Sequence, residues 1–263
     1  MPQPDGPDLF DAHGRCLPGR TSAPVHRESR RYFRLGEPEI APAAILARTA
    51  QHLAPDLETS LESFRDRIAS TRQQLEADPL TRNVLRGVAV PFILPRLSVH
   101  DIGETFDTRF LPAVGNAYRA HLPDYDFVDH HPAGTAGKLT SRPGARHERL
   151  LAAMAQGEVC GLYFPCLTEF SVPAAVDRLA ELPACFLLSG AFDTAAALVG
   201  TPDLLLRRDG YPPLLWLSGV EAEAPDAGYH FEAYGYNLTF NRRPHLGQTA
   251  EYWWHGLTVL CED

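Results

Sequence analysis

The sequence has almost no lysine, no closely spaced cysteine pair and no long apolar run. Lys138 is the single lysine in a chain of 24 basic residues, so it is the sole candidate for amine chemistry. Apolar runs such as those at residues 184–188 and 214–217 are far shorter than the roughly 20 residues that cross a bilayer. The N-terminus is acidic and lacks the apolar stretch of a signal peptide. We therefore expect no membrane span and no membrane partner.

The charge balance and the cysteines narrow the class of protein further. A formal net charge of −9 disfavours a general nucleic-acid binder, because binding to phosphates needs a basic face. The five cysteines are odd in number and contain no CxxC pair, which is typical of reduced, buried thiols. These features predict a cytoplasmic protein without a nucleic-acid partner.

The length and composition predict a packed core. The chain has 263 residues, of which 44% are hydrophobic and 22% charged. Residues 1–30 contain few large apolar groups and are expected to form a flexible N-terminal arm. Residues 31–263 are expected to form a single α/β domain, with a helical subregion at about 37–121 and a sheet-forming subregion at about 125–263.

The clearest periodic pattern predicts an amphipathic helix over residues 57–77, with Asp56 as its N-cap. Its apolar stripe has 4,3,4,3,4 spacing and consists of Leu57, Leu61, Phe64, Ile68, Thr71 and Leu75. Further helices are expected at about 102–121, 145–156, 172–182 and 193–199. Ser171 is the predicted cap of the third of these, and Pro173 falls in its first turn, where proline is tolerated.

Three short apolar runs predict strands buried on both faces. They lie at residues 159–164, 185–188 and 214–217 and alternate with helices, which is typical of a parallel sheet with crossover helices. The aromatic-rich stretches at 229–240 and 251–260 predict two longer antiparallel strands that extend or cap this sheet. The expected fold is thus α/β: a helical N-terminal half leads into a mostly parallel, helix-flanked sheet with an antiparallel C-terminal extension.

Polar residues follow the predicted strands at the edge where parallel sheets bind ligands. The candidate ligand-binding residues there are Cys166, Thr168, Ser189, Gly190, Asp193 and Thr194, and Glu169 is the candidate acid or base. Ser189-Gly190 belongs to one of two Leu-Ser-Gly turns, and it opens directly into a helix whose N-terminus favours an anion. The alternative is that these residues supply only turn and cap chemistry.

A histidine-rich loop supplies the second group of candidates. His131 is the candidate general base, because the pKa of an imidazole is close to neutral pH. His130, His131 and His147 together form the alternative of a metal-dependent enzyme, although no HExxH or HxH spacing is present. Residues 132–140 depart from a phosphate-binding loop at Pro132 and Leu139, so the sequence identifies no cofactor.

These patterns predict a protein that binds a small polar or anionic metabolite at the strand carboxyl ends and acts on it as an enzyme of unspecified reaction class. The competing hypothesis is a non-catalytic protein that forms homo-oligomers or binds a partner protein. It would use the helix over 57–77 and the aromatic C-terminal segment as its interface.

Overall fold

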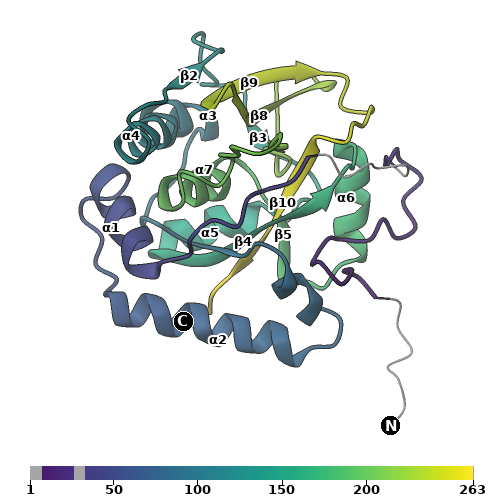
Figure 1. The fold of residues 1–263 in the computed structure, drawn as a ribbon, viewed down its shortest axis with the longest axis horizontal. Coiled ribbons are helices and arrows are strands. Elements are labelled where there is room, and N and C mark those ends of the chain that lie inside the picture. Colours follow the sequence, from purple (N-terminus) through teal and green to yellow (C-terminus); the bar gives the residue numbers. More distant parts are fainter. Residues whose placement is uncertain (1–7, 27–32, 263) are drawn as a thin grey trace.

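The computed structural model describes residues 8–26 and 33–262, which form a mixed α/β fold around a large sheet (Figure 1). The helices are α1 (Pro42–His52), α2 (Leu61–Ala77), α3 (Ile102–Thr105), α4 (Leu111–His121), α5 (Glu148–Gln156), α6 (Val172–Glu181) and α7 (Ala191–Gly200). The 3₁₀ helix η1 (Arg82–Arg86) lies between α2 and α3, and the π-helix η2 (Phe106–Phe110) lies between α3 and α4. None of the helices in the described ranges is long and apolar enough to cross a membrane.

The strands belong to a large sheet and a short separate ladder. The large sheet contains β1 (Val90–Leu94), β2 (Phe127–Asp129), β4 (Val159–Thr168), β5 (Phe186–Leu188), β6 (Leu214–Trp216), β8 (Ala227–Tyr234), β9 (Asn237–Pro244) and β10 (Trp253–Leu260). Its order is β1-β4-β10-β6-β8-β9-β2, and β5 also pairs with β10. The short ladder joins β3 (Thr140–Ser141) to β7 (Val220–Glu221).

The strand pairings correct the expectation of a mostly parallel sheet. The three apolar runs do form strands, β4, β5 and β6, but each of them pairs with β10. Only the β10–β6 and β2–β9 pairs of the large sheet are parallel among the described strands. β10 therefore lies in the middle of the sheet instead of extending or capping it, which explains why six of its eight residues are buried.

The first aromatic stretch forms a hairpin and not the single strand expected. β8 and β9 pair along their whole length, with Tyr234 opposite Asn237, so Gly235 and Tyr236 make a two-residue turn. Their φ angles of 58° and 69° are those of a type I′ turn, which matches the twist of the flanking strands. The apolar alternation continues across this turn, so periodicity alone did not locate it.

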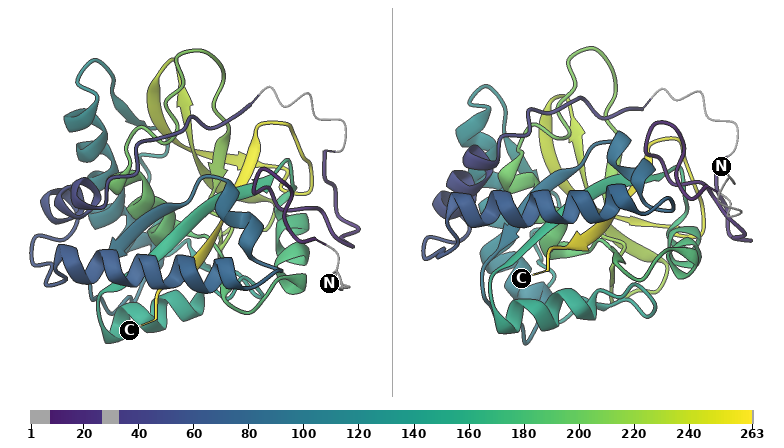
Figure 2. Two further views of the ribbon diagram at one scale, coloured as in Figure 1. Left: turned by 60° about the horizontal axis from the view of Figure 1, so that its bottom comes forward. Right: turned by 90° about the horizontal axis from the view of Figure 1, so that it is seen from below.

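α2 confirms most of the predicted amphipathic helix. Phe64, Ile68, Thr71 and Leu75 are buried against the domain, as the 4,3,4 spacing requires. The helix begins later than expected, because Ser60 is the cap and accepts a hydrogen bond from the Ser63 amide. Figure 2 shows α2 lying along the outside of the sheet, near the C-terminus.

The other expected helices differ mainly at their ends. Ser171 caps α6 by accepting a hydrogen bond from the Ala174 amide, as predicted. The expected helix over 102–121 is present but contains the π-helical turn η2. α7 begins two residues before the expected start, and Asp193 stabilises its N-terminus by accepting a hydrogen bond from the Gly190 amide at 2.8 Å.

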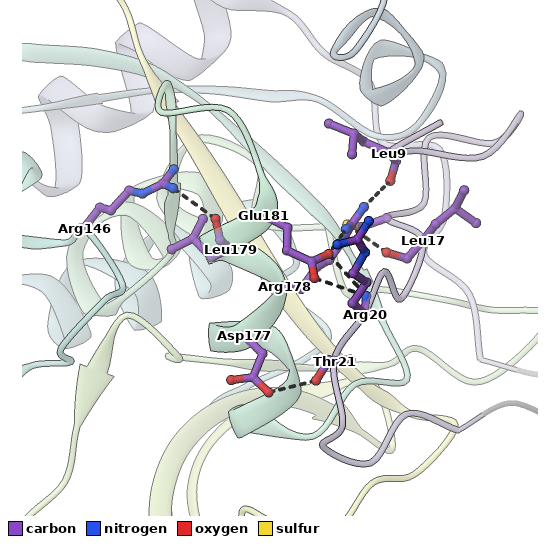
Figure 3. Close-up of polar contacts among 10 residues, drawn as sticks. Leu9, Leu17, Arg20, Thr21, Arg146, Asp177, Arg178, Leu179 and Glu181 are labelled. Atoms are coloured by element: carbon purple, nitrogen blue, oxygen red, sulfur yellow. Dashed lines mark hydrogen bonds and ion pairs between the residues drawn. The ribbon is translucent and has the colours of Figure 1, made fainter. Parts of the chain in front are cut away.

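The described part of the N-terminal segment, residues 8–26, contacts α6 and the core. Phe10 is 1% exposed and packs within the same apolar cluster as Phe186, at 5.6 Å between ring centroids. Thr21 donates a hydrogen bond to Asp177, and the Arg20 amide donates to Glu181 (Figure 3). Residues 1–7 and 27–30 of the expected arm lie outside the described residues, and flexibility of the arm and the domain boundary at residue 30 stay predictions.

The far end of α6 is held by Arg146. Its guanidinium donates hydrogen bonds to the carbonyls of Leu179 and Leu182, at the end of α6, of Pro183 in the following loop, and of Phe186, the first residue of β5. The amides of Leu182 and Phe186 also donate to the carbonyls of Leu179 and Pro183, so Arg146 adds a second donor to these two acceptors. Arg146 thereby fixes β5 relative to α6, and the Arg146–Leu179 bond is visible in Figure 3.

Candidate functional site

A cavity of about 720 Å³ lies between α2, the beginning of β1, the end of β4 and the connecting segment, residues 33–41, that leads into α1. Its wall is mainly apolar and includes Phe33, Leu35, Ile40, Ile68, Val88, Pro91, Pro165 and Trp254. In the view of Figure 1 the connecting segment crosses β4 on its way to α1. The cavity therefore forms where segments far apart in the sequence meet.

The end of β4 brings three of the predicted site residues to this cavity. Cys166, Thr168 and Glu169 all belong to its lining. Glu169 has a φ of 69°, an uncommon angle for a residue with a side chain. Its backbone is held on both sides: its amide donates to the Trp253 carbonyl at 2.7 Å, and its own carbonyl accepts from the Thr249 hydroxyl at 2.6 Å. The carboxylate is thus carried on a fixed turn at the cavity wall.

Positive charge predominates among the described residues that line the cavity. They include Arg15, Arg34, Arg72 and Arg86 against Glu37 and Glu169, although the whole chain is negative. Arg15 is paired with Asp11 at 2.6 Å. Arg72 and Arg86 form no ion pair with any residue in the described ranges. The cavity therefore presents two guanidinium groups that a bound anion could engage.

The thiol in the cavity wall is poorly suited to nucleophilic attack. Cys166 is 5% exposed, and burial raises the pKa of its thiol well above the ordinary value. A thiolate is the reactive form of cysteine, so a neutral buried thiol acts as part of the apolar wall. Glu169, directly after β4, is then the ionisable side chain at this end of the strand that could take part in chemistry.

The predicted residues after β5 lie in the core and not in the cavity lining. Ser189, Asp193 and Thr194 are each 0% exposed. The Thr258 hydroxyl donates to Asp193 at 2.6 Å and accepts from the Ser189 hydroxyl at 2.8 Å. Through these two hydrogen bonds, Thr258 of β10 holds Ser189 and Asp193 at the start of α7. It matches the alternative in which these residues serve turn and cap chemistry.

The two Leu-Ser-Gly turns contact one another. The Gly219 amide donates to the Ser189 carbonyl at 2.7 Å, which joins the turn after β6 to the turn after β5. The second turn also holds a buried serine–histidine pair: Ser218 Oγ lies 2.5 Å from His255 Nδ1. His255 Nε2 lies 2.8 Å from the Phe170 carbonyl, which can only accept, so Nε2 carries the proton and Ser218 donates to Nδ1.

The three histidines of the metal hypothesis do not converge. His131 contacts Tyr229, with Nε2 3.2 Å from the phenol oxygen, and is outside the cavity lining. His147 is fully buried against Gly190, whereas His130 is exposed. Within residues 8–26 and 33–262 no group of three histidine, cysteine, aspartate or glutamate side chains could hold a metal ion. His131 and Glu169 are therefore not neighbours in a common cavity.

Sequence reasoning missed the arginines of α2 and η1 and the connecting segment. Arg72 and Arg86 looked like ordinary charged residues on a helix surface, and no spacing within the chain links them to β4. Their common location follows only from the packing of α2 beside β4. No local signal could have identified them.

Comparisons with known protein families, curated protein sequences and solved structures found no match for this chain. Its function must be inferred from the chemistry of the site. The cavity at the end of β4 is the feature that carries this inference, because it combines a mainly apolar wall with charged groups.

Proposed function

We propose that this protein binds a small molecule with an anionic group and an apolar portion in the cavity at the end of β4. The observation that carries the proposal is the cavity itself, whose volume of about 720 Å³ is within the usual range for small-molecule sites. Its mainly apolar wall and its few charged groups are the combination that provides affinity and orientation in such sites. The polar or anionic ligand expected from the sequence agrees with this chemistry.

The arginines give the anionic preference. Arg72 and Arg86 lie at the lining without ion-pair partners in the described ranges, so an anion would not have to displace an internal carboxylate. Charge-assisted hydrogen bonds from guanidinium to carboxylate or phosphate are stronger than neutral ones. An uncharged ligand of the same shape would leave this interaction unused.

Catalysis at this site stays a prediction that rests on Glu169. Its carboxylate is the group that could accept or donate a proton to a molecule in the cavity. His131 could not assist from its place beside Tyr229. Binding is therefore the central proposal, and a reaction would have to use Glu169 with a proton partner supplied by the ligand or water.

The competing oligomer hypothesis has less support. Phe64 and Ile68, the centre of the proposed interface stripe, are 0% and 6% exposed within the single chain. Side chains that are already packed in the domain cannot also form the core of an interface. The aromatic C-terminal segment is likewise used inside the sheet, where Trp253 is 3% exposed.

A cavity-filling substitution tests the proposal. Ile40 lines the cavity on the connecting segment and is 37% exposed, so Ile40→Trp should reduce the cavity volume without disturbing the core. Leu80→Trp is the matched control, because Leu80 is 41% exposed and lies outside the lining. Thermal-shift screening against amphipathic carboxylates, phosphates and sulfonates identifies a ligand, and calorimetry then measures its affinity.

The two variants should behave differently. We expect Ile40→Trp to weaken binding by at least tenfold and Leu80→Trp to leave the dissociation constant within twofold of the wild-type value. Equal binding by wild type and both variants would contradict a ligand site in this cavity. Loss of binding in both variants would point to a general loss of folding, which their unfolding midpoints would reveal.

A further inference from the structure

A second hollow adjoins the cavity and shares two of its arginines. It has a volume of about 300 Å³ and is lined by Arg72, Glu76, Arg82, Asn83, Leu85 and Arg86, from the C-terminal half of α2 and from η1. Arg72 and Arg86 belong to the linings of both spaces. The cavity and this hollow therefore meet at these two arginines.

The hollow has an excess of positive charge. It contains three arginines and one glutamate, and neither Glu76 nor Arg82 forms an ion pair among the residues that the structure describes. Asn83 contributes an amide, which already donates to the Phe10 carbonyl at 3.3 Å. Three guanidinium groups around one small hollow exceed what a single carboxylate ligand needs. They suit a dianion with several acceptor oxygens.

We infer that the ligand is a phosphate monoester of an apolar group, with the phosphate between Arg72, Arg82 and Arg86 and the apolar group in the main cavity. This inference rests on the proposed function, because it requires the cavity to be a ligand site. A monoester phosphate carries a charge of about −1.5 to −2 at neutral pH and has three terminal oxygens. Its one ester oxygen leads the apolar group away from the charge, toward the part of the cavity lined by Ile68 and Val88.

The size of the two spaces supports this division. The phosphate occupies the smaller hollow at the protein surface, where water completes its hydrogen bonds. The apolar group enters the larger space beside Trp254, where each buried methylene should strengthen binding about fourfold. Inorganic phosphate alone would lack this contribution, and an alcohol of the same chain length would lack the arginine contacts.

The test uses octyl phosphate below its micelle concentration, with octanol, inorganic phosphate and hexyl phosphate as comparison ligands. Calorimetry measures the affinity of each for the full chain and for the triple variant Arg72→Ala, Arg82→Ala and Arg86→Ala. Arg65→Ala is the control, because Arg65 is an exposed arginine of α2 outside both linings. Ile40→Trp tests occupancy of the cavity by the octyl chain.

The inference predicts a defined pattern. Octyl phosphate should bind at least tenfold more tightly than octanol and, with two more buried methylenes, about fifteenfold more tightly than hexyl phosphate, whereas inorganic phosphate should bind very weakly. The triple variant should lose at least tenfold in affinity for octyl phosphate but keep its affinity for octanol. Arg65→Ala should bind all four compounds as the wild type does, and added salt should weaken binding of the phosphate compounds but not of octanol.

Other results separate the two claims. Equal affinity for octanol and octyl phosphate, both lost in Ile40→Trp, would overturn the phosphate inference and leave the proposed function intact. Binding of octyl phosphate that Ile40→Trp does not affect would contradict the cavity and with it the proposed function. Comparable binding of inorganic and octyl phosphate would show surface anion binding only and would also overturn the inference.

Discussion

His255 should make the folded protein sensitive to acid. Its imidazole is fully buried, accepts a hydrogen bond from Ser218 and donates one to the Phe170 carbonyl. Burial is the largest influence and lowers the pKa of His255 to about 4; the Phe170 carbonyl raises the pKa, and the positive charge of Arg142 lowers it. The unfolded chain has the ordinary histidine pKa of 6.5.

This difference in pKa sets the direction in which stability changes with pH. Below pH 6.5 His255 binds a proton in the unfolded state but not in the folded state. Its contribution to stability is therefore present above pH 6.5 and is lost as the pH falls toward 4. The shift from 6.5 to about 4 corresponds to a loss of about 3 kcal/mol from this group, of which about 2 kcal/mol is lost by pH 5.

Urea unfolding at several pH values between 7.5 and 4.5 measures this loss. His255→Gln lacks the titrating group and retains an amide donor, so its absolute stability should fall while its stability changes less with pH. His100→Gln, at an exposed position, is the control. Parallel stability curves for the wild type and His255→Gln between pH 6.5 and 4.5 would refute the reasoning, whatever the absolute stability of the variant.

Three further substitutions test the packing of the fold. Gly256→Ala should destabilise the protein by about 1 to 3 kcal/mol in urea unfolding, because a Cβ there would lie 2.3 Å from an aromatic ring, whereas Gly157→Ala meets nothing within 4 Å and should change stability by less than about 0.5 kcal/mol. Arg146→Ala should lower the free energy of unfolding by about 2 to 4 kcal/mol, because four carbonyls lose a donor. The control Arg149→Ala removes a single exposed hydrogen bond and should lower it by less than about 1 kcal/mol. Equal losses would contradict the role of Arg146 in holding the end of α6. Phe64→Ala should lower the free energy of unfolding by about 3 to 5 kcal/mol, and this loss should not depend on protein concentration. A concentration-dependent midpoint would instead favour the oligomer hypothesis.

Local patterns predicted much of the secondary structure. The stripe of α2 and the cap and first-turn proline of α6 depend on residues within a few positions of one another, so the sequence could reveal them. The apolar runs of β4, β5 and β6 were identified for the same reason. Helix ends were less accurate, because Ser60 and Asp56 are both good caps and tertiary packing decides between them.

The sheet order could not be predicted from these patterns. Short apolar runs separated by helices fit a parallel sheet, but the pairing depends on β10, which lies some 90 residues after β4 in the chain (Trp254 pairs with Thr168). Its aromatic residues indicated a strand without indicating its neighbours. The residues expected at the strand carboxyl ends are separated in the structure: Glu169 and Thr168 line a cavity, whereas Ser189 and Asp193 are buried in the core.

The most direct test of the cavity as a ligand site is an NMR titration of the three tryptophan indole N–H signals with octyl phosphate. Trp254 lines the cavity, whereas Trp216 is 1% exposed and packs against Trp253 and His230 outside it. We predict that the Trp254 signal shifts progressively and saturates while the Trp216 signal does not move, and that Ile40→Trp abolishes the shift. An unchanged Trp254 signal at saturating octyl phosphate, or equal shifts of Trp254 and Trp216, would contradict binding in the cavity.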